Sequence, residues 1–202
     1  MIISHKHKFI FVKTAKTAGT SIEIFLSQHC GPLDVLTPII PHVEPHLPRN
    51  CQGFYNHIPA HAIKNQIGKK IWNSYFKFCV ERNPWDKTLS HFHMKKSRED
   101  NTLTLQRYLS EGNFPINFPK YTDPDDPKKV IVDEVVYYES LINDLDRLFK
   151  RIGIPFYGSL GANAKSEYRT DRRHYHEVYS PEQGAFIEDV FKQELSLHCY
   201  RF

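Results

Sequence analysis

One short stretch of the sequence has the residue types of an anion-binding loop. The segment Lys16-Thr17-Ala18-Gly19-Thr20-Ser21 combines a lysine, a glycine and three hydroxyl side chains. The lysine supplies a positive charge, the hydroxyls can donate hydrogen bonds, and the small residues Ala18 and Gly19 let a phosphate approach the backbone. The first N–H groups of a helix have no internal partner, so a helix following this loop would favour phosphate or a related anion.

The flanking residues predict the elements that would position this loop. Phe9 to Val12 form an apolar run with the length of a buried strand. After the loop, a helix is predicted by three apolar residues at helical spacing, Ile22, Phe25 and Leu26. The spacing differs from the G-x-x-x-x-G-K-[ST] nucleotide loop because the lysine precedes the glycine. An ordinary strand-turn-helix with a solvated loop is the alternative interpretation.

A second candidate phosphate site follows another predicted strand. The alternating run from Phe76 to Glu81 is typical of a buried strand, and Pro84 can open a helix directly after it. Arg82 then stands at the carboxyl end of a strand, where open α/β sheets bind ligands, and Ser90 lies two helical turns further on. An arginine there can bind a phosphate with two N–H groups. The alternatives are a surface ion pair for Arg82 and an ordinary helix-surface hydroxyl for Ser90.

Two histidines are candidates for a general base. His57 precedes, and His61 lies within, a helix predicted to start at Pro59 and to end at Gly68. An imidazole with a pKa near ~6.5 suits proton transfer at neutral pH. Histidines four residues apart could also bind a metal, but the glutamate of H-E-x-x-H and an obvious third ligand are missing, so no metal site is predicted. A structural histidine is the alternative for either residue.

The remaining chain continues the alternation of strands and helices. A strand is predicted over residues 130–138, and a last helix is expected to begin at Ser180 and to bury Phe186 and Phe191. The proline-rich residues 31–56 are expected to form a loop that shapes the site of the second substrate, and a disordered insertion is the alternative. Strands alternating with helices predict an α/β fold with a central parallel sheet and helices on both faces, in one domain spanning residues 1–202.

Composition limits the function classes. The chain has 202 residues, 40% of them hydrophobic and 25% charged, which is typical of a folded domain. A formal charge of +4 suits an anionic ligand but is too small to indicate nucleic-acid binding. The four cysteines form no C-x-x-C pair and are expected to be free thiols. Without an apolar stretch of ~20 residues or room for a signal peptide before the first strand, no membrane span is expected and a cytoplasmic location is predicted.

The two candidate phosphate sites together resemble those of a known family. Residues 16–21 resemble the 5′-phosphosulfate loop of sulfotransferases that use 3′-phosphoadenosine 5′-phosphosulfate (PAPS), and residues 76–90 resemble their 3′-phosphate motif, including the eight-residue step from Arg to Ser. Residues 132–141 and the closing residues 200–202 are similar to further elements of that family. The chain looks most like the membrane-type and carbohydrate sulfotransferases, here without their membrane anchor.

The resemblance implies a role for each matching residue. The fold would be a P-loop-like three-layer sandwich. Residues Lys16 to Ser21 would hold the 5′-phosphosulfate, with Lys16 stabilising the charge that develops as the sulfuryl group leaves, and Arg82 with Ser90 would bind the 3′-phosphate. His57 occupies the place of a histidine that precedes a helix in relatives, which favours it over His61 as the base.

Two further basic residues belong to the same implied site. Residues 154–179 carry many cations, either as a solvated charge run or as an anion-binding segment. In relatives a similarly placed basic loop closes over the nucleotide, which implies this role for Lys165 and Arg169. No metal is implied, because lysine, arginine and backbone amides meet the charge of the donor.

Two departures from the family pattern concern the neighbours of these residues. Ala15 stands where many relatives have proline, which is expected to loosen the start of the loop. Glu81 stands where a valine is common. If its side chain faced the 3′-phosphate it would repel that group, but strand alternation is expected to point Glu81 away from the face of Arg82.

The sequence therefore predicts transfer of a sulfuryl group from PAPS to a hydroxyl of a glycan or a small molecule. A P-loop-like kinase is one alternative, although the chain lacks both G-x-x-x-x-G-K-[ST] and an evident magnesium-binding carboxylate motif. The other alternative is a non-catalytic protein that binds a nucleotide or a sulfated glycan.

Overall fold

The structure is a computed structural model that describes residues 1–161, 168 and 171–202 of the chain. By contacts between Cα atoms the chain divides into two compact units. The first unit contains residues 1–81 and 117–161, and the second contains residues 82–116 together with the described residues from 168 to 202.

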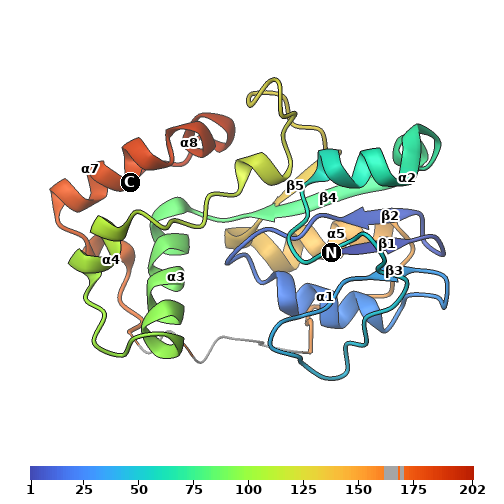
Figure 1. The fold of residues 1–202 in the computed structure, drawn as a ribbon, viewed down its shortest axis with the longest axis horizontal. Helices are drawn as coiled ribbons and strands as arrows, with labels where there is room; N and C mark the ends of the chain where they lie inside the picture. The colour runs from blue at the N-terminus through green and yellow to red at the C-terminus, as the bar shows by residue number, and fades with distance from the viewer. Residues whose placement is uncertain (162–167, 169–170) are drawn as a thin grey trace. The chain divides into compact units, whose positions relative to one another are not determined.

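The first unit is built on a five-stranded sheet with the order β3-β1-β2-β4-β5 (Figure 1). Its strands are β1 (Ile2–Ser4), β2 (Phe9–Phe11), β3 (Val35–Leu36), β4 (Phe76–Glu81) and β5 (Glu134–Tyr137). β2, β4 and β5 are parallel to one another, whereas β1 pairs antiparallel with both β2 and β3. The predicted α/β fold with central parallel strands is confirmed, and β1 and β3 add an antiparallel edge that the sequence pattern did not reveal.

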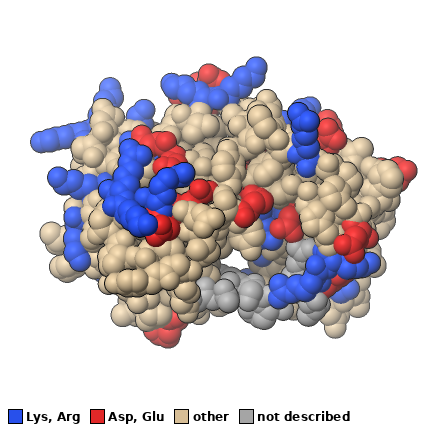
Figure 2. Space-filling model, turned by 180° about the vertical axis from the view of Figure 1, so that it is seen from behind, with Lys and Arg blue, Asp and Glu red and all other residues tan. Residues whose placement is uncertain are grey.

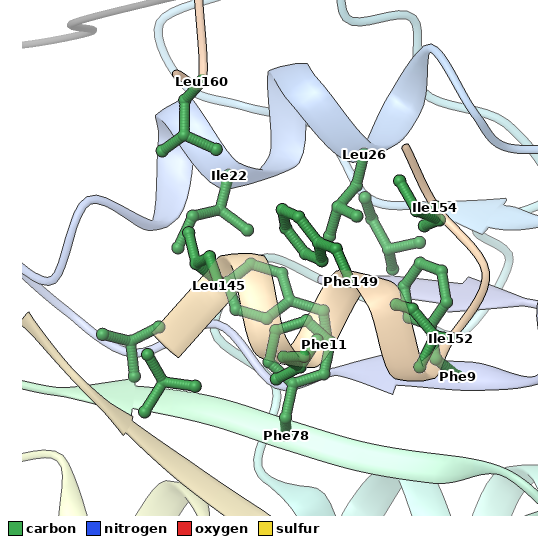
Figure 3. Close-up of a cluster of buried hydrophobic side chains, with 14 of the residues drawn as sticks. Phe9, Phe11, Ile22, Leu26, Phe78, Leu145, Phe149, Ile152, Ile154 and Leu160 are labelled. Carbon is green, nitrogen blue, oxygen red and sulfur yellow. The ribbon is translucent and has the colours of Figure 1, made fainter. Parts of the chain in front are cut away.

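Helices cover both faces of this sheet. They are α1 (Gly19–Ser27), α2 (Ala60–Ser74) and α5 (Leu141–Arg151), with 3-10 turns η1 (Phe118–Lys120) and η2 (Tyr138–Ser140). α1 and α2 lie on opposite sides of the sheet in Figure 1. Figure 3 shows the core between the sheet, α1 and α5, where Phe11 of β2 stacks on Phe78 of β4 with ring centroids 5.1 Å apart. Period-2 strands and a 3.6-period helix stripe thus bury their apolar faces together.

Two boundaries in the first unit differ from the predicted ones. α2 continues past Gly68 to Ser74 through a kink, because Gly68 adopts a left-handed φ of 77° and the helix resumes after it. The third parallel strand is shorter than predicted, since only Glu134–Tyr137 pair with β4. Before it, the Asp133 carboxylate accepts hydrogen bonds from the backbone N–H and the ammonium of Lys77 (both 2.8 Å), so this residue anchors the start of the strand pair.

The second unit is helical. Its helices are α3 (Pro84–Arg98), α4 (Leu105–Glu111), α6 (Tyr175–Val178), α7 (Pro181–Val190) and α8 (Lys192–His198). Asn83 caps α3 by accepting from the N–H groups of Trp85 and Asp86, and Pro84 occupies the first position. In the core of this unit, Lys87 of α3 and Glu194 of α8 form a fully buried ion pair of 2.5 Å. Such a pair favours one arrangement of the two helices, since either charge alone would be uncompensated.

The last predicted helix is divided in two. The capping box at Ser180 and Gln183 is present as predicted, but the chain leaves the helical conformation between Val190 and Lys192. The predicted burial of Phe186 is wrong, because this side chain is 44% exposed and Ile187 is buried in its place. The buried stripe of α7 is therefore one residue out of phase with the predicted one.

Charged side chains of both signs share the surface that faces the viewer in Figure 2. Among the described residues, no helix combines the length and the apolar character needed to cross a bilayer.

Candidate functional site

The loop between β2 and α1 has the strand-loop-helix arrangement that the sequence predicted. The N–H of Val12 donates to the carbonyl of Phe78 (2.9 Å), which extends the pairing of β2 with β4. The hydroxyl of Thr14 then donates to the carbonyl of Val80. These bonds hold the start of the loop beside the end of β4, and the loop leads directly into α1 at Gly19. The N-terminus of α1 is therefore presented at the carboxyl edge of the parallel strands.

The backbone of this loop is strained. Lys16 and Ala18 have φ values of 62° and 60°, in the left-handed region. For a residue with a side chain this conformation costs roughly 1–2 kcal/mol. Strain of this kind persists only where the surroundings hold it, and it is concentrated at ligand-binding sites.

Packing explains the glycine at position 19. A Cβ atom at Gly19 would lie 2.9 Å from Cγ of Lys13 and 3.4 Å from the carbonyl oxygen of Thr14. The Lys13 stem occupies this space because its ammonium is 2.5 Å from Oε2 of the buried Glu23. Burial raises the pKa of the Glu23 carboxyl, but the amino group of Met1 and the Lys13 ammonium outweigh burial and lower it. The carboxylate thus holds Lys13 against the first turn of α1.

The hydroxyl side chains in and beside the loop have different surroundings. The Thr14 hydroxyl donates its proton to Val80, so the 2.8 Å contact between the Thr14 and Thr17 hydroxyls uses the proton of Thr17. Thr17 is fully buried, and its hydroxyl serves the internal structure of the loop. Thr20 and Ser21 lie in the first turn of α1, and both are largely buried. Of the three hydroxyl residues between 16 and 21, Thr17 therefore offers a ligand its backbone N–H rather than its side chain.

His57 is attached to the same loop. Its Nδ1 lies 3.1 Å from the carbonyl oxygen of Lys13, and its own φ of 61° is left-handed. Because a carbonyl can only accept, Nδ1 carries the proton and Nε2 has the lone pair of a neutral imidazole. Burial first, and the nearby charge of Lys13 second, lower the pKa of His57 to about 4. His57 is therefore neutral at pH 7 and oriented, with the lone pair of Nε2 available to accept a proton.

His61 is the second residue of α2, and its Nδ1 is buried without a hydrogen-bond partner among the described residues. His57, unlike His61, is held by a bond to the candidate loop. Among the described residues, no group of three or more His, Cys, Asp or Glu side chains could hold a metal ion.

Arg82 and Ser90 belong to the second unit. Arg82 is 7% exposed, and its Nε and Nη2 donate to Oδ2 of Asp86 over 2.8 and 2.6 Å. The ion pair that the sequence left open as an alternative is thus present, and it ties Arg82 to the first turn of α3. Ser90 lies half-buried in the middle of α3. Lys165 and Arg169 lie outside the described residues.

The sequence analysis missed a side chain that contacts the loop. The amide of Asn117 accepts from the N–H of Ala15 (2.8 Å) and donates to the carbonyl of Ala15 (3.1 Å). The same amide nitrogen donates to Oε1 of Glu81 (3.2 Å), and the hydroxyl of Tyr121 donates to Oε2 (2.9 Å). Ala15 is therefore held by a side chain about a hundred residues away, which no local pattern could indicate. Residues 117–121 show no recognisable motif in the sequence.

The chain is similar in sequence to one known protein and in fold to another. No family model matches the chain. Over 101 residues it is 42% identical to an uncharacterized protein of Archaeoglobus fulgidus, in a match that covers 48% of this chain and 84% of the other. The two chains belong to one family.

The crystal structure of mouse sulfotransferase SULT7A1 complexed with PAP aligns with 98% of this chain and 88% of its own, at a TM-score of 0.62 and 13% identity. This chain has the sulfotransferase fold. The likeness is one of architecture, and it covers nearly the whole chain. Within the sulfotransferase fold, the loop after β2 and the residues after β4 are the two segments in which the sequence predicted phosphate sites.

The lowered pKa of His57 predicts a pH dependence of stability. His57 is neutral in the folded protein down to about pH 4, whereas an unfolded histidine takes up a proton near pH ~6.5. The unfolded state therefore binds more protons in this window, and stability is lost as the pH falls from ~6.5 to ~4. We expect the free energy of unfolding, measured with urea, to decrease between pH 7.5 and pH 5 by about 1–2 kcal/mol more in the wild type than in His57→Gln.

Replacement of the exposed His42 by glutamine is the control, and it should lose as much stability as the wild type on acidification. Equal losses for the wild type and His57→Gln would mean that His57 is not held neutral in the folded protein.

Proposed function

We propose that this protein transfers a sulfuryl group from PAPS to a hydroxyl of a glycan or small-molecule acceptor. The observation that carries the proposal is the strained loop of residues 13–18, which leads a lysine and a helix N-terminus to the carboxyl edge of a sulfotransferase-type sheet. That a sulfotransferase of this fold was crystallised with PAP supports the choice of donor.

The 5′ end of the donor is assigned to the loop. The backbone N–H groups of residues 17–21 and the hydroxyls of Thr20 and Ser21 would bind the phosphosulfate, where the dipole of α1 favours an anion. Lys13 packs so closely against Gly19 that a side chain at position 19 would displace it, so the glycine keeps the loop in this conformation. Lys16 would contribute the full positive charge.

The 3′-phosphate is assigned to Arg82 and Ser90 on the resemblance of residues 76–90 to the family motif. Asp86 already accepts two hydrogen bonds from Arg82, so it would hold the guanidinium in place while the phosphate shares its positive charge. Lys165 and Arg169, outside the described residues, are proposed to close over the nucleotide.

The chemistry follows from these roles. The acceptor oxygen forms a bond to sulfur while the bond between sulfur and the bridging oxygen of the donor breaks, and 3′,5′-bisphosphoadenosine leaves. The proton of the acceptor hydroxyl passes to Nε2 of His57, whose Nδ1–H is held by the Lys13 carbonyl. Lys16 stabilises the negative charge on the departing oxygen, an effect typically worth ~3–4 kcal/mol for one well-placed donor.

The acceptor is assigned to the long loop between α1 and α2. This loop exposes large apolar side chains, which an acceptor with an apolar part could cover: Leu33, Ile40, Leu47 and Tyr55.

Isothermal calorimetry with 3′,5′-bisphosphoadenosine, adenosine 5′-monophosphate and ATP tests the donor. Micromolar binding of the bisphosphate with little binding of the other two is the expected result. Preference for ATP would replace the proposal with a kinase, and absence of binding to all three would leave a non-catalytic protein.

Replacing Arg82 with alanine tests the 3′-phosphate assignment. Loss of a buried, charge-assisted contact typically costs 2–5 kcal/mol, so affinity for the bisphosphate should fall by about 10²-fold or more, with little change for adenosine 5′-monophosphate. Calorimetry measures both. Arg107→Ala, on the exposed side of α4, is the matched control and should bind as the wild type does. Equal losses for both nucleotides would remove Arg82 from the 3′-phosphate site.

A further inference from the structure

We infer that Asn117 is a positioning residue, which holds the loop of residues 13–18 in its strained, anion-binding conformation, and that Glu81 and Tyr121 fix the orientation of Asn117. This inference rests on the proposed function and deepens it, because it names the side chains that prepare the loop for the donor.

Both donors and the oxygen of the Asn117 amide are hydrogen-bonded within the first unit. Its oxygen accepts from the N–H of Ala15, one amide hydrogen goes to the carbonyl of Ala15, and the other goes to Glu81. A primary amide has two donors, and both are used. Asn117 is fully buried, so these bonds are shielded from competition with water. The two bonds to Ala15 fix both backbone polar groups of one residue.

Glu81 and Tyr121 fix the orientation of the Asn117 amide. Both oxygens of the fully buried Glu81 accept hydrogen bonds, one from Asn117 and one from the hydroxyl of Tyr121. A flipped Asn117 amide would turn its oxygen toward the Glu81 carboxyl and its NH₂ group toward the N–H of Ala15. Both contacts would be unfavourable, so Glu81 selects the orientation that pairs with the loop. The glutamate that departs from the family pattern thus has a structural partner in the same unit.

The residue held by Asn117 lies next to the strained part of the loop. Lys16, with its left-handed φ, follows Ala15 directly, and Ala18 repeats this conformation two residues later. Without an external restraint, both residues would favour right-handed or extended backbone. The measured affinity for an anion is proportional to the fraction of molecules whose loop is in the anion-binding conformation, so it decreases when that fraction decreases. A clamp at Ala15 therefore raises donor affinity without touching the donor.

The residue type at position 15 agrees with a clamp made of hydrogen bonds. Many proteins with the resembling motif have proline here, whose ring restricts the backbone and removes the N–H. In this chain the N–H is present and donates to Asn117 over 2.8 Å. A proline at position 15 and the hydrogen bond to Asn117 cannot coexist, because proline has no backbone N–H to donate. A proline should therefore replace the clamp only in a variant that lacks the Asn117 side chain.

Three variants test this inference: Asn117→Ala, Ala15→Pro and the double variant. Asn117→Ala should accelerate hydrogen exchange of the amides of residues 16–18 and weaken bisphosphate binding by about five- to tenfold. Ala15→Pro alone should also weaken binding, because the Asn117 oxygen loses its donor. The double variant should recover most of the affinity and the slow exchange, a non-additivity that a purely structural role of Asn117 would not produce.

Two further variants keep the result interpretable. Thr122→Val, which removes only a 2.8 Å bond to Phe118 in the same segment, is the matched control and should leave the loop unchanged. Tyr121→Phe is nearly isosteric and should accelerate exchange at residues 16–18 less than Asn117→Ala does. If Asn117→Ala fails to fold, Tyr121→Phe decides, and unchanged exchange at these residues would overturn the inference.

The failure of the proposed function can be told apart from the failure of the clamp. If the wild type does not bind the bisphosphate, the proposed function fails, and hydrogen exchange alone then decides the clamp. Uniformly faster exchange over the whole first unit in Asn117→Ala, without rescue by Ala15→Pro, would overturn the inference in favour of a general stabilising role.

Discussion

Replacing Lys16 with alanine is expected to lower kcat by about 10²–10³-fold, while affinity for 3′,5′-bisphosphoadenosine falls by less than about tenfold. The bisphosphate lacks the sulfuryl group and keeps the contacts assigned to the helix N-terminus and to Arg82. The lysine charge is required most when the bridging oxygen becomes negative, which happens only in the transition state. Transfer from sulfur-labelled PAPS to a panel of glycans and phenols measures kcat, and calorimetry measures affinity.

The choice of control for Lys16 follows from the surroundings of the other lysines. Lys13 is unsuitable, because removing it would leave the buried Glu23 with less compensation. Lys70, exposed on α2, is a matched control, and Lys70→Ala should keep wild-type turnover. An increase in KM with unchanged kcat in Lys16→Ala would mean that the lysine stabilises the bound substrate and the transition state equally. That result would contradict the proposed catalytic role of Lys16.

Replacing His57 with alanine is expected to lower kcat by about 10²–10⁴-fold and to leave bisphosphate affinity nearly unchanged. His57 is the only proposed acceptor of the proton from the hydroxyl, and nothing in its proposed role involves the nucleotide. The same transfer and calorimetry measurements separate the two effects. His61→Gln is the matched control, since His61 lies four residues further along the chain, at the start of α2, and is the rival base. If kcat decreased strongly in His61→Gln and only slightly in His57→Ala, His61 rather than His57 would be the general base.

The pH dependence of the wild type gives a second readout of the base. Activity needs the neutral imidazole, so kcat/KM should fall as the pH drops through the pKa of His57, which burial and Lys13 lower to about 4. The sequence alone predicted this limb near ~6–7, from the ordinary pKa of histidine. Negative charge on a bound donor would raise the pKa again, so the limb in kcat should lie above the limb in kcat/KM. The residual activity of His57→Ala should lack the limb.

The sequence by itself determined the local parts of the candidate site. The strand, loop and helix of residues 9–27 follow from an apolar run, small polar residues and a helical stripe that are contiguous in the chain. The same holds for the end of β4, where Asn83 and Pro84 cap α3 as their residue types favour. Such signals are readable because the interacting groups lie within a few residues of one another.

Tertiary structure decided everything that depends on distant partners. Asn117 holds Ala15 across 102 residues of sequence, the buried Glu81 accepts a hydrogen bond from Asn117, and no spacing rule connects these positions. It also decided protonation, because burial against Lys13 rather than residue type sets the low pKa of His57. The residue types of contiguous positions thus indicate the candidate loop. Long-range hydrogen bonds and desolvation exist only after folding, and they fix the shape of the loop and the protonation state of His57.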